Sequence, residues 1–126
     1  MTKTLQDAIV RISNGYLHKL IEIEVINSFL IVSFLKLLYS NGFIRGFIVK
    51  KNTILVLLKY YRGVPAIRHI STISKLSRRV YLSKREIITL SQNQEFFVLT
   101  TPKGLFTNKN IFDKNFMGGE ILCRVS

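Results

Sequence analysis

The spacing of apolar residues predicts a short amphipathic helix at the beginning of the chain. Apolar side chains recur at intervals of three and four residues from Leu5 to Ile12, which places them on one face of a helix. Thr4 can cap this helix, with Asp7 three residues further on, and Asn14-Gly15 is expected to end it.

A second and much more apolar helix is predicted to extend to about Tyr39. Asn27 or Ser28 can serve as its N-cap, and Gly42 stands where a left-handed C-cap favours glycine. Because the polar stripe of this helix is narrow, most of its surface must be covered by other elements.

Period-two patterns predict a three-stranded sheet that covers the second helix. Ile21 to Val25 alternates apolar residues with glutamates, which is typical of a strand with one buried face. Lys50-Lys51-Asn52 can form the turn of a hairpin between the other two strands, Phe47–Val49 and Ile54–Tyr60.

Gly63-Val64-Pro65 marks the expected boundary between two small lobes. Residues 1–65 are predicted to form an α/β lobe and residues 66–126 a mainly β lobe, so the fold class is α/β. In the second lobe, residues 84–88 fit a helix or a strand, Thr107 can cap a short helix through Phe116, and Gly118-Gly119 can turn the chain into its last strand. The predicted strands of this lobe are Ile67–Ile73, Arg79–Leu82, Phe96–Leu99 and Ile121–Val125.

The charge of the chain calls for an anionic partner. The 126 residues include 19 Lys and Arg against 7 Asp and Glu, a formal net charge of +12. Such an excess is self-repelling, and nucleic acid is the compensating partner that it favours. A membrane-surface or protein-bridging role for Phe29 to Leu38 is the alternative, but this segment, interrupted by Ser33 and Lys36, is too short to cross a bilayer.

No arrangement of reactive residues in the sequence predicts an enzyme. His18 and His69 are the two histidines, and neither lies in a catalytic motif. Glu22 and Glu24 share a strand face that we expect to be solvated, and the glycines form no phosphate loop. The single cysteine, Cys123, excludes an internal disulfide and a cysteine-based zinc cluster. The sequence therefore predicts no catalysis, metal, cofactor or small-molecule substrate.

One polar segment, Thr100-Thr101-Pro102-Lys103-Gly104, carries groups that are suited to RNA. Its two hydroxyls and its cation can bind ribose and phosphate, and its glycine allows a close backbone approach. Taken alone, the pentapeptide is better explained as an ordinary turn. Its interpretation depends on the rest of the chain.

Taken with the rest of the chain, this segment resembles the eighth family of small-subunit ribosomal proteins, which bind RNA. The C-terminal match consists of residues 98–107, VLTTPKGLFT, followed by residues 118–123, GGEILC. An independent match lies at residues 7–15, DAIVRISNG, and Gly42-Phe43-Ile44 and Leu58 to Gly63 fall at the expected positions. The resemblance thus covers essentially the whole chain.

The resemblance implies a structural protein of the small ribosomal subunit that binds a helix in the central domain of the ribosomal RNA. It also implies a role in assembly and contacts with neighbouring small-subunit proteins. By position, Thr100 and Thr101 would contact an irregular part of the helix, because a regular A-form major groove is too narrow to read. Lys103 would contact phosphate, and Gly104 would keep the segment close to the RNA.

The same resemblance gives RNA-binding roles to four further residues. Tyr81 matches a tyrosine that packs at the RNA surface, with packing in the protein core as the alternative. Arg79 lies beside it in the same predicted strand and would contact phosphate. In the first helix, Arg11 would contact phosphate and Asn14 matches a family position.

A glycine turn is implied to present a carboxylate to the RNA-binding segment. Gly118 and Gly119 would form the turn, and Glu120 would follow it. A carboxylate near phosphate needs hydrogen-bond donors, so we expect Glu120 to orient Thr100 or Thr101, or to meet a base amino group.

The chain departs from the family pattern in ways that suggest altered neighbours. Pro102 replaces a serine and so removes a hydroxyl and a backbone donor. Phe29 and Ile31 stand where lysines commonly face RNA, so a protein neighbour is expected to cover them, and Ser77 replaces a glycine.

The expected location is an organellar ribosome. The chain is rich in Ile, Leu, Phe, Lys, Asn and Ser, as an AT-rich coding sequence would produce, and its beginning lacks the pattern of a secretory signal or transit peptide. We expect the small subunit of a mitochondrial ribosome, with a plastid or the bacterial cytoplasm as alternatives. A non-ribosomal RNA-binding regulator is the alternative function.

Overall fold

The structure, a computed structural model, describes residues 3–74, 78–91, 96–101, 104–108 and 118–126. The chain divides into two compact units, one that ends at His69 and one that runs from Ile70 to Ser126. The first unit combines helices with an antiparallel sheet, and the described part of the second is mainly strands. The predicted α/β class is therefore confirmed.

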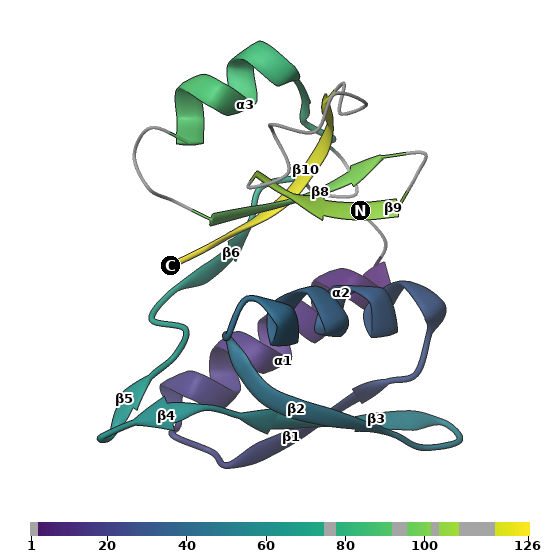
Figure 1. The fold of residues 1–126 in the computed structure, drawn as a ribbon. Helices are drawn as coiled ribbons and strands as arrows, with labels where there is room; N and C mark the ends of the chain where they lie inside the picture. The colour runs from purple at the N-terminus through teal and green to yellow at the C-terminus, as the bar shows by residue number, and fades with distance from the viewer. Residues whose placement is uncertain (1–2, 75–77, 92–95, 102–103, 109–117) are drawn as a thin grey trace. The chain divides into compact units, whose positions relative to one another are not determined.

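In the N-terminal unit, two helices cover one face of a three-stranded sheet (Figure 1). Strand β3 lies between β1 and β2 and runs antiparallel to both. A short hairpin of β4 and β5 follows the sheet. The elements are α1 (Lys3–Leu17), β1 (Glu22–Ile26), α2 (Phe29–Ser40), β2 (Ile44–Val49), β3 (Thr53–Leu58), β4 (Tyr60–Tyr61) and β5 (Val64–Pro65).

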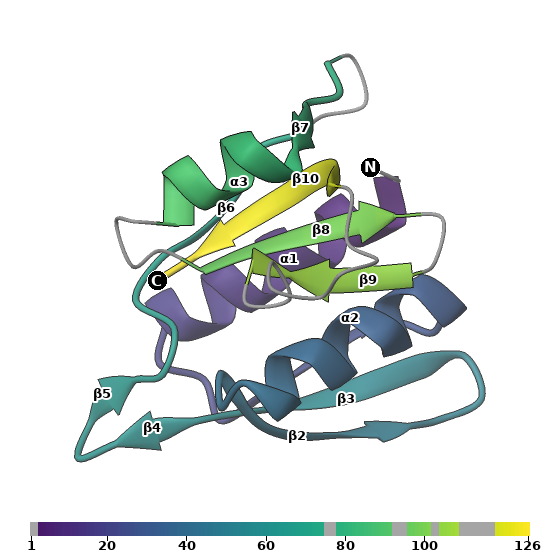
Figure 2. The ribbon, with the colours of Figure 1, turned by 45° about the horizontal axis from the view of Figure 1, so that its top comes forward.

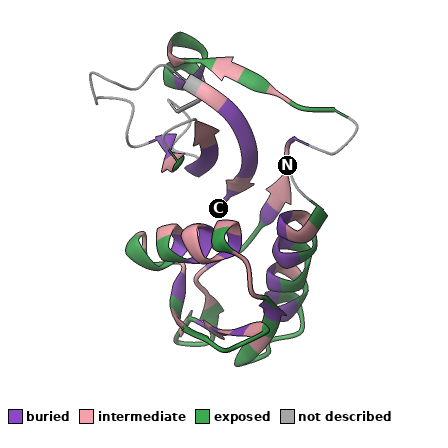
Figure 3. Cartoon of the chain, turned by 90° about the vertical axis from the view of Figure 1, so that its right-hand side faces the viewer, coloured by how far each residue is buried: buried purple, intermediate pink, exposed green. Residues whose placement is uncertain are grey.

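The core of this unit lies between its helices and its sheet. The buried positions of α1 fall along one side of the helix (Figure 3), and they include the predicted apolar set from Leu5 to Ile12. Ile54, Val56 and Leu58 of β3 are buried on the face that the helices cover. None of the described helices is long and apolar enough to span a membrane.

Helix α1 does not end at Asn14-Gly15, and in this respect the prediction was wrong. The helix begins before Thr4 and continues to Leu17. Gly15 is buried within it, and a Cβ atom added there would lie 2.8 Å from Cγ2 of Ile23 in β1. The glycine therefore allows helix and strand to approach closely, and its role is packing rather than termination.

Both predicted ends of α2 are confirmed. The amide of Ile31 donates to the hydroxyl of the N-cap Ser28 at 3.2 Å. At the other end Gly42 has φ +78°, and the amide of Phe43 donates to the carbonyl of Leu38 at 2.9 Å. This is the arrangement in which a left-handed glycine satisfies the last carbonyls of a helix.

Phe29 and Ile31 were expected to share an exposed surface, and the structure separates them. Phe29 is 89% exposed, whereas Ile31 is 1% exposed and belongs to the core. The two side chains lie two positions apart on a helix, which turns them to different sides. A neighbour could therefore cover Phe29, but Ile31 already packs inside the protein.

The C-terminal unit is organised around strand β10, which pairs with three other strands (Figure 2). Strands β6, β7 and β8 all run antiparallel to β10, and β9 extends the sheet beyond β8. Ile87 of α3 packs with Phe97, Leu99 and Ile121 in a buried cluster. The described elements are β6 (Ile70–Thr72), β7 (Tyr81–Ser83), α3 (Lys84–Ser91), β8 (Phe96–Thr101), β9 (Gly104–Thr107) and β10 (Gly118–Val125).

The ambiguous segment at residues 84–88 is helical because a capping box starts it. Ser83 accepts a hydrogen bond from the amide of Glu86 at 3.3 Å, and the amide of Ser83 donates to the Glu86 carboxylate at 3.4 Å. These two reciprocal bonds satisfy backbone donors in the first turn. The Ser-x-x-Glu spacing was present in the sequence and could have decided the question.

The predicted helix from Thr107 to Phe116 stays a prediction, whereas the predicted glycine turn was wrong. Thr107 ends strand β9 and the next residue, Asn108, is 3-10 helical, but the rest of that predicted helix lies outside the described residues. Gly118 and Gly119 are not a turn, because they belong to β10 and pair with Ser83 and Leu82 of β7. Strand β10 therefore begins three residues before the predicted start at Ile121.

Candidate nucleic-acid interface

Three residues from different strands form a polar row across the C-terminal sheet. In the strand register, Glu120 of β10 stands opposite Tyr81 of β7 on one side and opposite Thr100 of β8 on the other. Side chains at directly paired positions point to the same face of a sheet. We call Tyr81, Glu120 and Thr100 the polar row; the resemblance had implied an RNA-binding role for all three.

The polar row occupies the face opposite α3. Leu99 and Ile121, the sequence neighbours of Thr100 and Glu120, pack against Ile87 of α3. Since successive side chains of a strand alternate between faces, Thr100 and Glu120 point the other way. Thr100 is half-buried and Glu120 is 6% exposed, whereas Tyr81 is 64% exposed. The alternative of Tyr81 as a core residue was therefore wrong.

Arg79 brings a permanent positive charge next to the polar row. A hydrogen bond from its guanidinium to the Tyr81 side chain raises the pKa of Arg79, and the charges of Tyr81 and Glu120 raise this pKa further. Arg79 is otherwise exposed. An arginine held beside a tyrosine and a carboxylate remains available to phosphate, because its planar group has five donors.

The two threonines that were predicted to lie in a loop belong to a strand. Thr100 and Thr101 are the last residues of β8, and Thr101 pairs with Gly104 of β9. The Thr101 hydroxyl donates to the Gly104 carbonyl at 3.1 Å, and Gly104 has φ +126°, a conformation that favours glycine. Pro102 and Lys103 lie outside the described residues.

Thr100 and Thr101 consequently have different positions on the hairpin. They are adjacent in a strand, so their side chains leave it on opposite faces. Thr100 joins Glu120 in the polar row, whereas Thr101 fastens the tip of the hairpin. The two hydroxyls, which had been given one shared role, separate into one on the row and one at the tip.

Gly119 is required by a close approach between β10 and β8. A Cβ atom added at Gly119 would overlap the carbonyl oxygen of Thr100 and lie 3.0 Å from Cγ2 of Thr101. A backbone oxygen cannot rotate away as a side chain can. Gly119 therefore lies beside the two threonines, and it does so as a strand residue and not as part of a turn.

Ser74 is a positioning residue that no sequence pattern indicates. Its fully buried hydroxyl donates to the carbonyl of Ile121 at 2.5 Å and accepts a hydrogen bond from the amide of Val80 at 2.9 Å. These bonds attach the segment that carries Arg79 and Tyr81 to strand β10. A single serine in an otherwise polar stretch gives no sequence signal for this role.

Arg11 and Asn14, the site residues implied in the N-terminal unit, are both exposed on α1. The Arg11 guanidinium donates to the carbonyl of Glu24 at 3.3 Å. This bond uses one of the five N–H donors of the Arg11 guanidinium, so the side chain can still bind phosphate.

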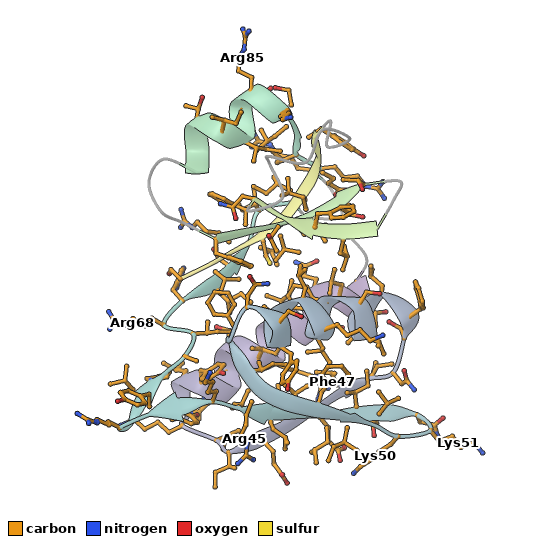
Figure 4. All side chains as sticks on the ribbon, viewed as in Figure 1. Arg45, Phe47, Lys50, Lys51, Arg68 and Arg85 are labelled. Atoms are coloured by element: carbon orange, nitrogen blue, oxygen red, sulfur yellow. The ribbon has the colours of Figure 1, made fainter. Side chains whose placement is uncertain are left out.

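A surface pocket of about 480 Å³ lies between α2 and β2 in the N-terminal unit. Lys36 and Tyr39 of α2 and Arg45 and Phe47 of β2 are among its lining residues. Phe47 points from β2 toward α2, and Arg45 points to the opposite side of the sheet (Figure 4). Lys36 therefore lies near two aromatic rings, those of Tyr39 and Phe47, whereas Arg45 leaves the strand on the other side. The sequence gives no signal for this set, because the four residues come from two elements and form no motif.

The described residues offer no constellation for metal or nucleophilic chemistry. They contain no group of three or more His, Cys, Asp or Glu side chains that could hold a metal ion. His18, in the turn after α1, and His69, just before β6, are both exposed. Cys123 is fully buried, and desolvation raises the pKa of its thiol to about 12.

We expect Cys123 to resist alkylation as long as the protein stays folded. With a pKa of about 12, only about one thiol in ten thousand is a thiolate at pH 8, and the thiolate is the nucleophile. Mass spectrometry after iodoacetamide treatment should show no adduct in native protein and full labelling in urea. Fast labelling of the folded chain would contradict this burial.

An exposed arginine, a hydroxyl-bearing hairpin and a polar row on a sheet are features of an RNA-binding protein. A family model described as ribosomal protein S8 matches residues 3–126. The small ribosomal subunit protein uS8 of Brucella anthropi is 37% identical over 124 residues, which cover 94% of this chain and 93% of that protein. The protein of the same name from Rhizobium leguminosarum bv. trifolii is 36% identical over 130 residues, with 99% and 98% covered. The chain therefore belongs to the ribosomal protein S8 family, which is structural and not enzymatic.

Proposed function

We propose that this chain is a structural constituent of the small ribosomal subunit that binds small-subunit ribosomal RNA through its C-terminal unit. Membership of the ribosomal protein S8 family supports the place in the subunit. The polar row of Tyr81, Glu120 and Thr100, with Arg79 beside it, is the observation that supports the binding surface.

Each member of the row suits a different part of an irregular RNA helix. The exposed ring of Tyr81 offers a stacking surface, and the Thr100 hydroxyl can donate to or accept from a base edge or a ribose. The carboxylate of Glu120 can accept from a base amino group, while Arg79 neutralises phosphate nearby. The target that we propose is a helix in the central domain of the RNA, and the neighbours are other small-subunit proteins.

We expect Thr100→Val to weaken specific RNA binding by about 1–3 kcal/mol, because valine keeps the shape of threonine but removes its hydroxyl. The measurement is the affinity for the central-domain helix and for an unrelated duplex at fixed salt. Thr72→Val in β6 is the matched control, since it makes the same change in another strand beside β10.

The two RNAs distinguish recognition from support of the fold. Loss on the cognate helix alone would establish a specific contact, whereas equal loss on both would reduce Thr100 to a scaffold residue. Lys103→Ala, in contrast, should weaken binding to both RNAs and flatten the dependence on salt, as removal of a phosphate contact does.

We further propose an organellar ribosome, in first place that of a mitochondrion, as the location. The support is compositional, since Ile, Leu, Phe, Lys, Asn and Ser are abundant. The relatives named above are bacterial proteins. Sedimentation of fractionated cell extracts tests the location: the chain should follow the small subunit of the organelle in moderately high salt. A chain that stays with cytoplasmic ribosomes, or leaves ribosomes altogether, would contradict this location.

A further inference from the structure

We propose that the helix-free face of the N-terminal sheet binds an apolar segment of a neighbouring protein, and that this segment carries a cation that meets Glu22. This inference concerns a surface of the other unit and does not depend on the polar row. It goes beyond RNA binding because it assigns a protein partner to one particular face.

The strand register places apolar side chains where a solvated face would carry polar ones. Helices α1 and α2 both lie on one side of the sheet (Figure 1), and Ile54, Val56 and Leu58 are buried beneath them. Leu55 and Leu57 alternate with these residues and so point to the other side. Ile48 pairs with Leu55, which places it on the same side.

The side chains of this open face are accessible. Ile48 is 51% exposed, and Ile26, which reaches the same side through its pairing with Thr53, is 55% exposed. Leu55 and Leu57 stay only half-buried although they belong to the central strand. We define the open face by these four residues, Ile26, Ile48, Leu55 and Leu57. No helix or strand of residues 3–69 packs on it.

The charges around the open face distinguish it from an RNA-binding surface. Glu22 pairs with Leu57 and Glu24 with Leu55, so two of the 7 acidic residues of a +12 chain stand along its β1 side. Glu24 lies 3.5 Å from Lys50, which neutralises it. Arg45 lies on β2, and Lys50 and Lys51 follow this strand (Figure 4), so side chains of both charges border the face. Phosphates would meet carboxylates and hydrocarbon here, which favours neither binding nor readout.

A protein segment fits this combination. Apolar side chains of the partner would cover the four apolar residues, and each square ångström removed from water contributes about 25 cal/mol. A lysine or arginine of the partner would face Glu22. Because Glu22 is exposed, this ion pair can form without prior rearrangement. Exposed apolar patches bordered by charged residues are typical of protein interfaces.

Site-specific photocrosslinking in assembled small subunits tests this proposal. A photoreactive phenylalanine derivative in place of Ile48 should crosslink to a protein, and the crosslinked peptide should contain apolar residues and a lysine or arginine. The same derivative in place of the exposed Lys51, in the hairpin turn next to the face, is the matched control and should give at most a small fraction of that yield. A crosslink from position 48 to RNA, to lipid or to a second copy of this chain would overturn the proposal, as would no crosslink.

A second variant separates this face from the RNA site. Ile48→Thr with Leu55→Thr keeps residues that favour strands but removes the apolar surface. Because position 48 is now threonine, the photoreactive residue is placed at position 57 of the same face. Its crosslink to protein should be at least tenfold weaker in the double variant than in the parent chain, while the affinity of the isolated chain for the central-domain helix stays within twofold. Glu22→Gln should lower the crosslink in the same way but by less. Thr100→Val should lower the RNA affinity and leave the crosslink unchanged. Failure of the RNA proposal and failure of this one therefore give different results. Unchanged crosslinking in the double variant would overturn the proposal.

Discussion

Replacement of Gly119 by alanine is expected to remove most of the specific RNA affinity and to destabilise the C-terminal unit. The added methyl group would overlap the carbonyl oxygen of Thr100 and crowd Cγ2 of Thr101 at 3.0 Å. Because the nearest atom is backbone, strands β10 and β8 must move apart. Overpacking of this kind reduces the free energy of unfolding by about 1–3 kcal/mol, or more where nothing can yield.

The effect on RNA binding follows from where the strands separate. Glu120 and Thr100 stand opposite each other one position from Gly119, so a shift of the strands misplaces both members of the polar row. Urea denaturation gives the stability, and a binding titration with the central-domain helix gives the affinity. Gly46→Ala is the matched control, because an added Cβ there meets nothing closer than 3.9 Å. Equal results for the two variants would show that the close approach of β10 to β8 is unimportant.

Gly119 also illustrates how far the sequence could define the site. The motif singled out Gly119, Glu120 and the two threonines, and these residues lie close together in the structure. It could not show that the glycines are strand residues, because a Gly-Gly pair is more typical of turns than of strands. What distinguishes the two cases is the distance to a neighbouring strand, and that distance depends on pairing between residues about twenty positions apart.

The fold was predicted best where the signal was local. Ser28, Gly42 and the Lys50 hairpin each act through neighbouring residues, and the structure confirms all three. Gly15 is also a glycine, but a glycine is needed there because the helix approaches Ile23 of β1. This is a tertiary contact, which periodicity does not reveal. Strand β9 was missed because it is only four residues long and begins with Gly104 directly after a Pro-Lys pair.

The site had the same limit. Tyr81, Glu120 and Thr100 were singled out individually, yet only the pairing of β7 and β8 with β10 puts them in one row. Ser74 and the pocket between α2 and β2 gave no pattern at all, because their roles arise from contacts between separate elements. Motifs therefore identified residues that carry chemistry, and the sheet decided which of them act together.

A lysine at position 31 is expected to destabilise the N-terminal unit by several kcal/mol, a large part of the roughly 5–15 kcal/mol that keeps a domain folded. Ile31 is 1% exposed, so Ile31→Lys removes a buried apolar side chain and brings an ammonium group into the core. It also places a positive charge in the first turn of α2, where the helix dipole is unfavourable to cations. Phe29→Lys is the matched control, since Phe29 is 89% exposed and the change should alter stability by no more than about 0.5 kcal/mol.

The pH dependence of the Ile31→Lys variant tests the physical cause. Burial lowers the pKa of a lysine below its unfolded value of about 10.4, so the unfolded state binds the proton more tightly. Stability relative to Phe29→Lys should therefore recover as the pH rises from 7 toward 10, and urea midpoints at several pH values measure this. A deficit that is the same at every pH would point to lost packing alone, and a variant as stable as the control would place position 31 at the surface. The resemblance places family lysines that face RNA at positions 29 and 31. In this chain only position 29 lies at the surface, so only there could a side chain reach RNA.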